Sequence, residues 1–440
     1  MTSRRNYPLL LASQFLGAFG DNATLAVILG QLTFQQRAGL LTASQVGAAN
    51  AVYASLFFVP YVLLAPLAGY LNDRFAKTGW LLGGNLIKLC GVALAATSVR
   101  LGPFWQGVGY LIVGVGACVY SPAKYGVLPE IVERERLVKA NGAVEFLTLI
   151  AILTGNIGGA AMIDRLHVLS CYGILVAIFG TSLLLNLCMA ATPAHPGVQL
   201  RATVDEFFGN FADLLANPRL FRVLCGTCMF WICGAVLKMN LQPWGLQAMK
   251  LGNNTQIAMV GLWLSVGIML GSVLAGQLHR VGDLRWTRHY GWLLASLIAL
   301  LGLVEGLRDA GWLRLHSLVT TPGSPMNRLE SLLRASPIPV AAEVIVTLLA
   351  AGAMAGLFLI PLNAALQSEC HQGRLGKTIA TQNFIDNLGM LAAGGLVFGG
   401  VKAGLSASGV FLGLSGFVAL VVTVLKIPPR TEQVLTGATG

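Results

Sequence analysis

Six charged side chains interrupt stretches of this sequence that are otherwise apolar and long enough to cross a bilayer. They are Asp21, Lys88, Lys124, Glu145, Lys238 and Asp386. A charge placed in hydrocarbon costs roughly 2.5–3.5 kcal/mol on insertion scales, so such a residue normally faces a partner or a watery cavity. Three of the six are cationic and three are anionic. We therefore expect a cavity between helices that suits a cargo carrying both signs of charge.

Polar residues accompany the acidic side chains at helical spacing. Asp21 shares a helix face with Gln14, seven residues earlier, and is followed directly by Asn22. Glu145 shares a face with Asn141, four residues earlier. We expect Asp21 to point to the centre of the helix bundle and to contact cargo or an ion. The alternative is a structural carboxylate paired with a fixed lysine.

The second half of the chain repeats this pattern with different residues. Asp386 and Asn387 lie next to each other in an apolar stretch, and Lys238 follows an apolar run with Trp231 one heptad before it.

Two lysines of the first half allow two interpretations each. Lys124 comes two residues after Pro122, which removes one helix hydrogen bond. Lys124 could line the cavity or extend to the membrane interface. Lys88 could line the cavity or pair with a neighbouring helix.

The elements that hold these residues are membrane spans. Of the 440 residues, 55% are hydrophobic and only 11% are charged, and the mean hydropathy is +0.71. Globular domains carry about 25% charged residues. Apolar runs of about 20 residues predict roughly twelve spanning helices. They lie near 8–33, 46–71, 79–99, 104–127, 138–162, 168–191, 220–247, 256–279, 288–305, 339–361, 377–401 and 406–426.

The predicted organisation is two halves of six helices each. Residues 1–191 form the first half, 192–218 a cytoplasmic linker with a short amphipathic helix around 204–215, 219–427 the second half and 428–440 a tail. Ser121-Pro122 corresponds to Ile360-Pro361 in a faint internal repeat. Two such halves are the architecture of major facilitator transporters. The fold class predicted is thus an all-α integral membrane protein with a major facilitator fold and two pseudo-symmetric halves.

Charge distribution predicts the orientation of these helices. Seventeen Lys and Arg residues fall on the side of the N-terminus and nine on the other, so both termini are expected in the cytoplasm. The net charge of +11 reflects this loop bias and does not indicate nucleic-acid binding. The N-terminal apolar run carries Asp21 and no cleavage site, so we expect a first spanning helix and no cleavable signal peptide. The loop at 306–338 is expected outside.

A gating loop is predicted between the second and third spans. The string Gly69-Tyr-Leu-Asn-Asp73-Arg74-Phe-Ala-Lys77 resembles the major facilitator loop signature. Gly69 would allow close helix contact, and Asp73, Arg74 and Lys77 would bridge neighbouring helix ends on the cytoplasmic side. The alternative is an ordinary basic loop. The second half keeps only a remnant around Asp283.

Metal and enzyme chemistry are weakly supported. Cys225-x-x-Cys228 has the spacing of a metal or redox pair, but no His lies nearby, so small buried thiols are the preferred interpretation. A membrane acyltransferase would need a His–Asp pair four residues apart in a loop, and the six histidines offer none. We therefore expect no cofactor, no metal and no enzyme activity.

Four strings resemble one family of transporters. They are Gln14-x4-Phe19-Gly-Asp-Asn22, Tyr120-Ser-Pro-Ala-Lys-Tyr-Gly126, Leu137-Val-Lys-Ala-Asn-Gly-x2-Glu145 and Ile360-Pro-Leu-Asn-x2-Leu-Gln367. Together they resemble the LplT family of bacterial lysophospholipid transporters, through most of both halves. The loop at 306–338 matches least. Where members of that family often carry Arg in span seven, this chain has Lys238, so a point charge replaces a bidentate fork.

The resemblance implies a major facilitator fold in the bacterial inner membrane. It implies that lysophospholipids, chiefly 2-acyl-glycerophosphoethanolamine, are flipped from the outer to the inner leaflet, where a separate acyltransferase/acyl-carrier-protein synthetase re-acylates them. Lys124 and Lys238 could hold the phosphate, while Asp21, Glu145 and Asp386 could hold the ammonium or balance the lysines. The alternative function is a proton-driven exporter of amphipathic drugs or metabolites.

Overall fold

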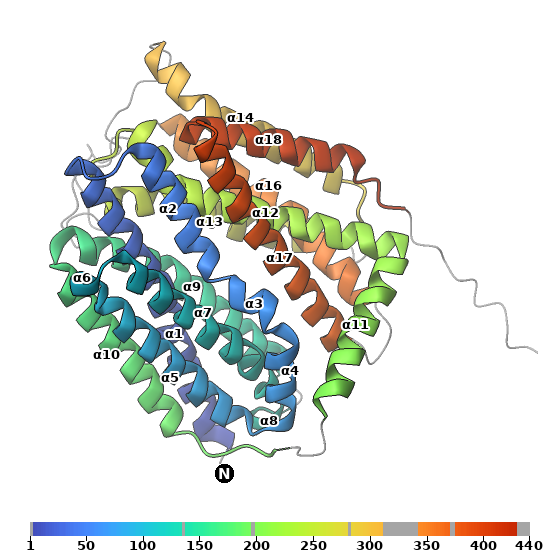
Figure 1. Cartoon of the computed structure of the whole chain (residues 1–440). Helices are drawn as coiled ribbons and strands as arrows, with labels where there is room; N and C mark the ends of the chain where they lie inside the picture. The colour runs from blue at the N-terminus through green and yellow to red at the C-terminus, as the bar shows by residue number, and fades with distance from the viewer. Residues whose placement is uncertain are drawn as a thin grey trace, which may run out of the picture.

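The computed structural model of the chain is a bundle of long helices (Figure 1). It describes residues 3–133, 137–194, 199–279, 283–310, 342–369 and 375–428. Twelve helices among the described residues are long and apolar enough to cross a membrane. The predicted span count is confirmed, and the bounds differ from the predicted ones by a few residues. The predicted loop at 306–338 lies mostly outside the described residues.

The first half holds six of these spans. The first, fourth, fifth and sixth spans are single long helices, and the third is a long helix followed by a short one. Their bounds, together with those of two short helices, are α1 Ser3–Arg37, α5 Lys77–Ala96, α6 Ser98–Leu101, α7 Pro103–Gly126, α8 Leu128–Ile131, α9 Leu137–Arg165 and α10 Val168–Leu187.

The second span is not one helix, as predicted, but three. They are α2 (Ala43–Leu56), α3 (Val59–Leu63) and α4 (Ala65–Arg74). Pro60 and Pro66 each stand within the first two residues of a new segment. Proline has no backbone N–H and clashes with the preceding turn, so the helix restarts at each of these positions.

A linker helix, α11 (Leu200–Ala216), connects the halves and confirms the predicted amphipathic helix, which is longer than expected. It contacts α4 of the first half and α17 of the second. The second half holds α12 Pro218–Gln247, α13 Asn254–Leu278, α14 Thr287–Asp309, α16 Ala342–Glu369, α17 Leu375–Lys402 and α18 Ala407–Val424.

Small residues let the helices of each half approach closely. A methyl group built on Gly116 of α7 would lie 2.5 Å from the carbonyl oxygen of Gly84 on α5. One built on Gly271 of α13 would lie 2.1 Å from the carbonyl oxygen of Ala353 on α16. Because neither contact leaves room for a side chain, backbone packs directly on backbone, which is the usual way of joining helices in lipid.

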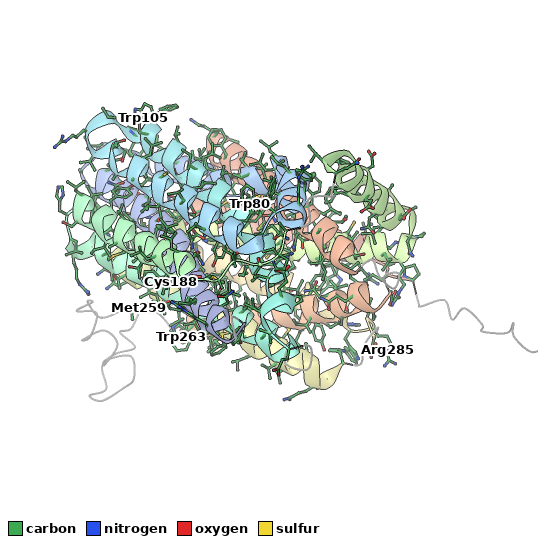
Figure 2. All side chains as sticks on the ribbon, turned by 90° about the horizontal axis from the view of Figure 1, so that it is seen from below. Trp80, Trp105, Cys188, Met259, Trp263 and Arg285 are labelled. Atoms are coloured by element: carbon green, nitrogen blue, oxygen red, sulfur yellow. The ribbon has the colours of Figure 1, made fainter. Side chains whose placement is uncertain are left out.

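The bundle has two ends. The N-terminus, the loop between α4 and α5, and α11 define one end, the linker face (Figure 1). The opposite end, the far face, carries the connections from α1 to α2, α9 to α10 and α12 to α13. Trp105 at the start of α7 and Arg285 before α14 lie toward opposite ends of the molecule (Figure 2). Both α1 and α12 run from the linker face to the far face.

Candidate functional site: the space between the two halves

Asp21 and Lys88 form a buried ion pair inside the first half. Lys88 Nζ lies 2.7 Å from Asp21 Oδ2, and the two side chains are 3% and 11% exposed. Lys88 comes close because Gly116 on α7 leaves room for its stem, and its ammonium lies 5.2 Å from the ring centroid of Tyr120. The structure therefore favours the structural alternative for both residues: a carboxylate paired with a fixed lysine.

Asn22, next to Asp21, faces a different partner. Its side-chain oxygen accepts a hydrogen bond of 3.0 Å from Lys238 Nζ on α12, and this bond connects the two halves. Lys238 is exposed, although its neighbours Leu237 and Met239 are buried. Among the described residues, no carboxylate forms an ion pair with Lys238. Its charge is thus directed at a neutral amide and at the accessible space between the halves.

Lys124 is buried near the linker end of α7. It is 9% exposed, and its ammonium lies 4.4 Å from the ring centroid of Tyr125. Glu145 stands on α9, but its side chain lies outside the described residues. The structure brings Asn22 and Lys238 together and leaves Lys124 nearer the linker face.

Asp386 and Asn387 point to different environments on α17. Asp386 is 3% exposed, and its Oδ1 accepts a hydrogen bond of 3.1 Å from the Thr227 hydroxyl of α12. Asn387 donates to the backbone carbonyl of Asn383 at 2.7 Å and is half-buried. Asp386 therefore lies in the packing between α12 and α17.

The predicted gating loop forms contacts within the first half. Lys77 pairs with Glu130 of α8, and Arg74 donates a 2.5 Å hydrogen bond to the Tyr70 hydroxyl. The side chain of Asp73 lies outside the described residues. Our expectation for Gly69 is wrong in this conformation: a methyl group there would meet no atom within 4 Å, so the glycine does not serve a close helix contact.

In the second half, the corresponding loop carries an exposed ion pair. Arg285 Nε lies 3.0 Å from Asp283 Oδ1. Hydrogen bonds from the Arg285 side chain and backbone lower the pKa of Asp283 to about 2. Exposed pairs of this kind contribute little to stability. Of the ion pairs in the two loops, the one between Lys77 and Glu130 is the better buried.

The halves are joined at the far face by a residue that the sequence analysis did not single out. Asp164, near the end of α9, accepts four hydrogen bonds from the start of α13. The donors are the backbone and side-chain N–H groups of Asn254, at 3.2 and 2.8 Å, and the backbone N–H and hydroxyl of Thr255, at 2.7 and 2.6 Å. The first N–H groups of a helix have no partner within the helix, so a carboxylate fits there.

Four more residues extend this junction. Thr33 of α1 donates to Asn254 Oδ1 at 2.8 Å, and Asn50 of α2 donates to Gln242 Oε1 at 2.8 Å. The amide of Gln242 donates to the Leu29 carbonyl at 2.6 Å. We call Asp164, Asn254 and Thr255 the far-face latch. Together with these bonds, the latch joins the two halves at the far face.

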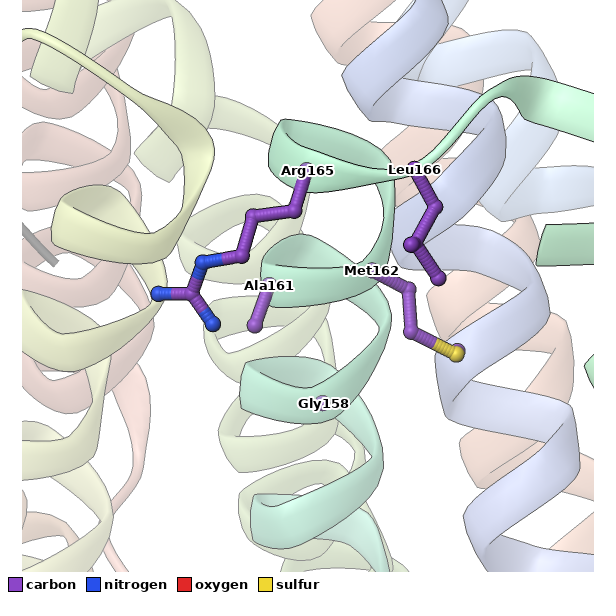
Figure 3. Close-up of a pocket in the computed structure, with 5 residues that line it drawn as sticks. All are labelled: Gly158, Ala161, Met162, Arg165 and Leu166. Atoms are coloured by element: carbon purple, nitrogen blue, oxygen red, sulfur yellow. The ribbon is translucent and has the colours of Figure 1, made fainter. Parts of the chain in front are cut away.

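A shallow pocket lies beside the latch but away from the predicted site residues. Its volume is about 200 Å³, and it is lined by Gly158, Ala161, Met162, Arg165 and Leu166 (Figure 3). Ligand pockets usually measure about 300–1,000 Å³. This pocket is therefore too small to hold a lipid cargo, and none of the predicted site residues lines it.

The cysteine pair of span seven packs as ordinary side chains. Cys228 Sγ lies 3.6 Å from the Ile385 carbonyl and faces Gly389 of α17. Within the described part of the chain, no group of three His, Cys, Asp or Glu residues could hold a metal ion.

The arrangement of two six-helix halves has a counterpart among known proteins. Residues 10–319 match the family model of the Major Facilitator Superfamily. The chain belongs to the Major Facilitator Superfamily. Two solved structures share its fold. The human organic anion transporter MFSD10 (TETRAN) is 15% identical with a TM-score of 0.66, covering 97% of this chain and 100% of that one. A POT family transporter in complex with 5-aminolevulinic acid is 11% identical with a TM-score of 0.71, covering 96% and 95%.

Within the Major Facilitator Superfamily, the similar curated sequences carry one name. A protein of Enterobacter sp. (strain 638), named lysophospholipid transporter LplT, is 31% identical over 95% of this chain and 94% of its own. Proteins of the same name from Photorhabdus laumondii, 31% identical over 98% and 97%, and Klebsiella pneumoniae, 30% identical over 96% and 96%, match as completely. The resemblance found in the sequence motifs is therefore confirmed over nearly the full length.

Proposed function

We propose that this chain transports lysophospholipids, chiefly 2-acyl-glycerophosphoethanolamine, from the outer to the inner leaflet of the bacterial inner membrane. The observation that carries the proposal is Lys238. Its ammonium faces the accessible space between the halves and has only a neutral described partner, Asn22. A cation in that position attracts an anion, and the phosphate of a lysophospholipid is the anion that the named relatives support.

The other candidate residues take roles that follow from their surroundings. Lys124 provides a second positive charge along the route to the linker face. Half-buried Asn387 offers an amide oxygen to the ammonium of the headgroup, Glu145 stays a predicted acceptor, and Asp386 keeps its buried hydrogen bond with Thr227. Asp21 keeps its ion pair with Lys88 and thereby fixes the position of Asn22 on the same turn of α1.

Transport requires the two halves to expose the site to each side in turn. We assign the linker face to the cytoplasm. Because the far-face latch joins the halves at the opposite end, we take this conformation as the one open to the inside. Lys77 and Arg74, with Gly69 and Asp73 of the same loop, belong to the gate on that side. A lysophospholipid delivered there would be re-acylated by a separate acyltransferase/acyl-carrier-protein synthetase. The protein itself would need no catalytic residue.

Lys238 also limits how the phosphate is held. An ammonium is a compact point charge on a flexible stem, whereas a guanidinium grips phosphate through two parallel hydrogen bonds. We expect Lys238→Arg to support transport, because the charge stays in place, and Lys238→Ala to abolish it.

The proposal is tested by uptake of labelled lysophosphatidylethanolamine into spheroplasts that lack their own transporter and contain the acyltransferase. We expect labelled diacyl lipid only when this chain is present and Lys238 is intact. Lys402→Ala, at the far end of α17, is the matched control and should retain uptake. Well-inserted protein without uptake would contradict the proposal, and export of amphipathic drugs under a proton gradient would then support the exporter alternative.

A further inference from the structure

The two helices that meet at Asn22 and Lys238 share a pattern that the headgroup does not explain. Each carries an aromatic residue seven positions before its polar residue: Phe15 before Asn22 on α1, and Trp231 before Lys238 on α12. Seven residues are two helical turns, about 10.5 Å along the axis. Because both helices run from the linker face, each aromatic ring lies on the same face as its polar partner, two turns nearer the linker face.

Trp231 is unusually exposed for its place in the fold. Its side chain is 39% exposed, while Phe230 beside it is 8% exposed and meets it edge-on at 5.4 Å between ring centroids. The helix that carries it, α12, is packed among α16, α17, α18 and α2. A residue on the Lys238 face of this enclosed helix therefore looks into the space between the halves.

Phe15 occupies the equivalent place on α1. It is half-buried and lies 6.4 Å from the ring of Phe19. Phe19 itself turns toward α9, where its ring would lie 3.0 Å from a methyl group built on Gly158. Phe15 is thus the aromatic residue of α1 left on the Asn22 face.

We propose that Phe15 and Trp231 form an acyl-chain subsite, which holds the first part of a single fatty-acyl chain below a headgroup bound at Asn22 and Lys238. This proposal rests on the proposed function and deepens it. Aromatic rings bury a large apolar area and tolerate many chain conformations, so the subsite would accept chains of different length. Because Phe15 stands on the first half and Trp231 on the second, both would contact one chain only while the two halves are as close as the contact between Asn22 and Lys238 holds them.

Binding to protein in nanodiscs separates this subsite from the headgroup site. The probes are glycerophosphoethanolamine, without an acyl chain, and its soluble hexanoyl and decanoyl monoacyl forms. Empty nanodiscs give the partition background. We expect the affinity of the parent protein to rise with chain length, because each further methylene buried from water favours binding.

The variants then distinguish the outcomes. We expect Trp231→Ala to weaken binding of the decanoyl probe about tenfold, which is equivalent to about 1.4 kcal/mol. Binding of glycerophosphoethanolamine should stay unchanged. Phe15→Ala should act in the same direction, Lys238→Ala should weaken all three probes, and Trp292→Ala, an exposed ring on α14, should change none. Equal losses for all probes in Trp231→Ala, or no loss, would overturn the subsite. Failure of the parent to bind any probe would instead overturn the proposed function.

Discussion

Asp164 offers the sharpest perturbation of the conformational equilibrium. Asp164→Ala removes all four hydrogen bonds that the carboxylate accepts from Asn254 and Thr255. It does not affect Asn253, which caps α13 by accepting a hydrogen bond from the backbone N–H of Gln256 at 2.8 Å. The substitution therefore weakens the contact between the halves without removing the helix start itself.

The magnitude follows from the number and charge of the lost bonds. A hydrogen bond to a charged group contributes about 1.5–3 kcal/mol, but all the partners regain water when the far face opens. We therefore count the four hydrogen bonds of Asp164 together as roughly one hydrogen bond to a charged group. A loss of about 1.5–3 kcal/mol corresponds to about a 10- to 150-fold shift toward the conformation open at the far face.

The assay is labelling of a cysteine in the central space by a membrane-impermeant thiol reagent added outside intact spheroplasts. Ala18→Cys is the reporter, because Ala18 lies one turn from Asn22 on the same face of α1. The protein without this substitution gives the background from the native cysteines. Inside-out vesicles check the orientation, since the reporter should react there in the parent protein.

We expect Asp164→Ala to raise outside labelling of the reporter about tenfold or more, and Thr255→Val, which removes only the hydroxyl bond, to raise it less. Asp309→Ala, an exposed acid at the end of α14, is the matched control and should leave labelling unchanged. Unchanged labelling in folded Asp164→Ala would refute the latch. Equal increases in the control would show general loosening instead.

Three further substitutions test the packing and the ion pair. Lys88→Ala leaves the Asp21 carboxylate buried without its partner, so we expect a loss of about 3–5 kcal/mol in detergent melting, whereas exposed Arg100→Ala should change stability by less than about 0.5 kcal/mol. Gly271→Ala should destabilise by about 1–3 kcal/mol because its methyl group meets the Ala353 carbonyl, while Gly276→Ala, in open space, should be neutral or stabilising by up to about 1 kcal/mol; the reverse order would contradict the packing. Phe384→Ala removes ring contacts to Phe207 and Phe211 at 5.6 and 6.2 Å, so protease cleavage in the linker should accelerate, and unchanged cleavage would show that α11 is held otherwise.

The spans and halves were predictable because each follows from local composition. A run of about 20 apolar residues has few structures open to it in lipid, so length and hydropathy suffice. Pro60 and Pro66 carried the signal for the division of the second span. We predicted one helix there because the apolar run is continuous. The amphipathic linker helix was predictable for the same local reason.

Partner choice was not predictable, because it depends on contacts between distant segments. Gln14 and Asp21 share a predicted face, yet Gln14 accepts a bond from Thr148 on α9 while Asp21 pairs with Lys88 on α5. Asp164 resembled an ordinary polar residue at a helix end. Only the run Asn253-Asn254-Thr255 at the next helix start hinted that a carboxylate was needed there.

The most direct test uses purified protein alone in liposomes that carry fluorescent lysophosphatidylethanolamine in one leaflet. Loss of fluorescence to an impermeant quencher reports movement between the leaflets, without any acyltransferase. We expect rapid redistribution with the parent protein and with Lys402→Ala, and only the protein-free rate with Lys238→Ala. Redistribution that is equally fast in Lys238→Ala, or absent from the parent, would contradict transport of lysophospholipid through the charged space between the halves.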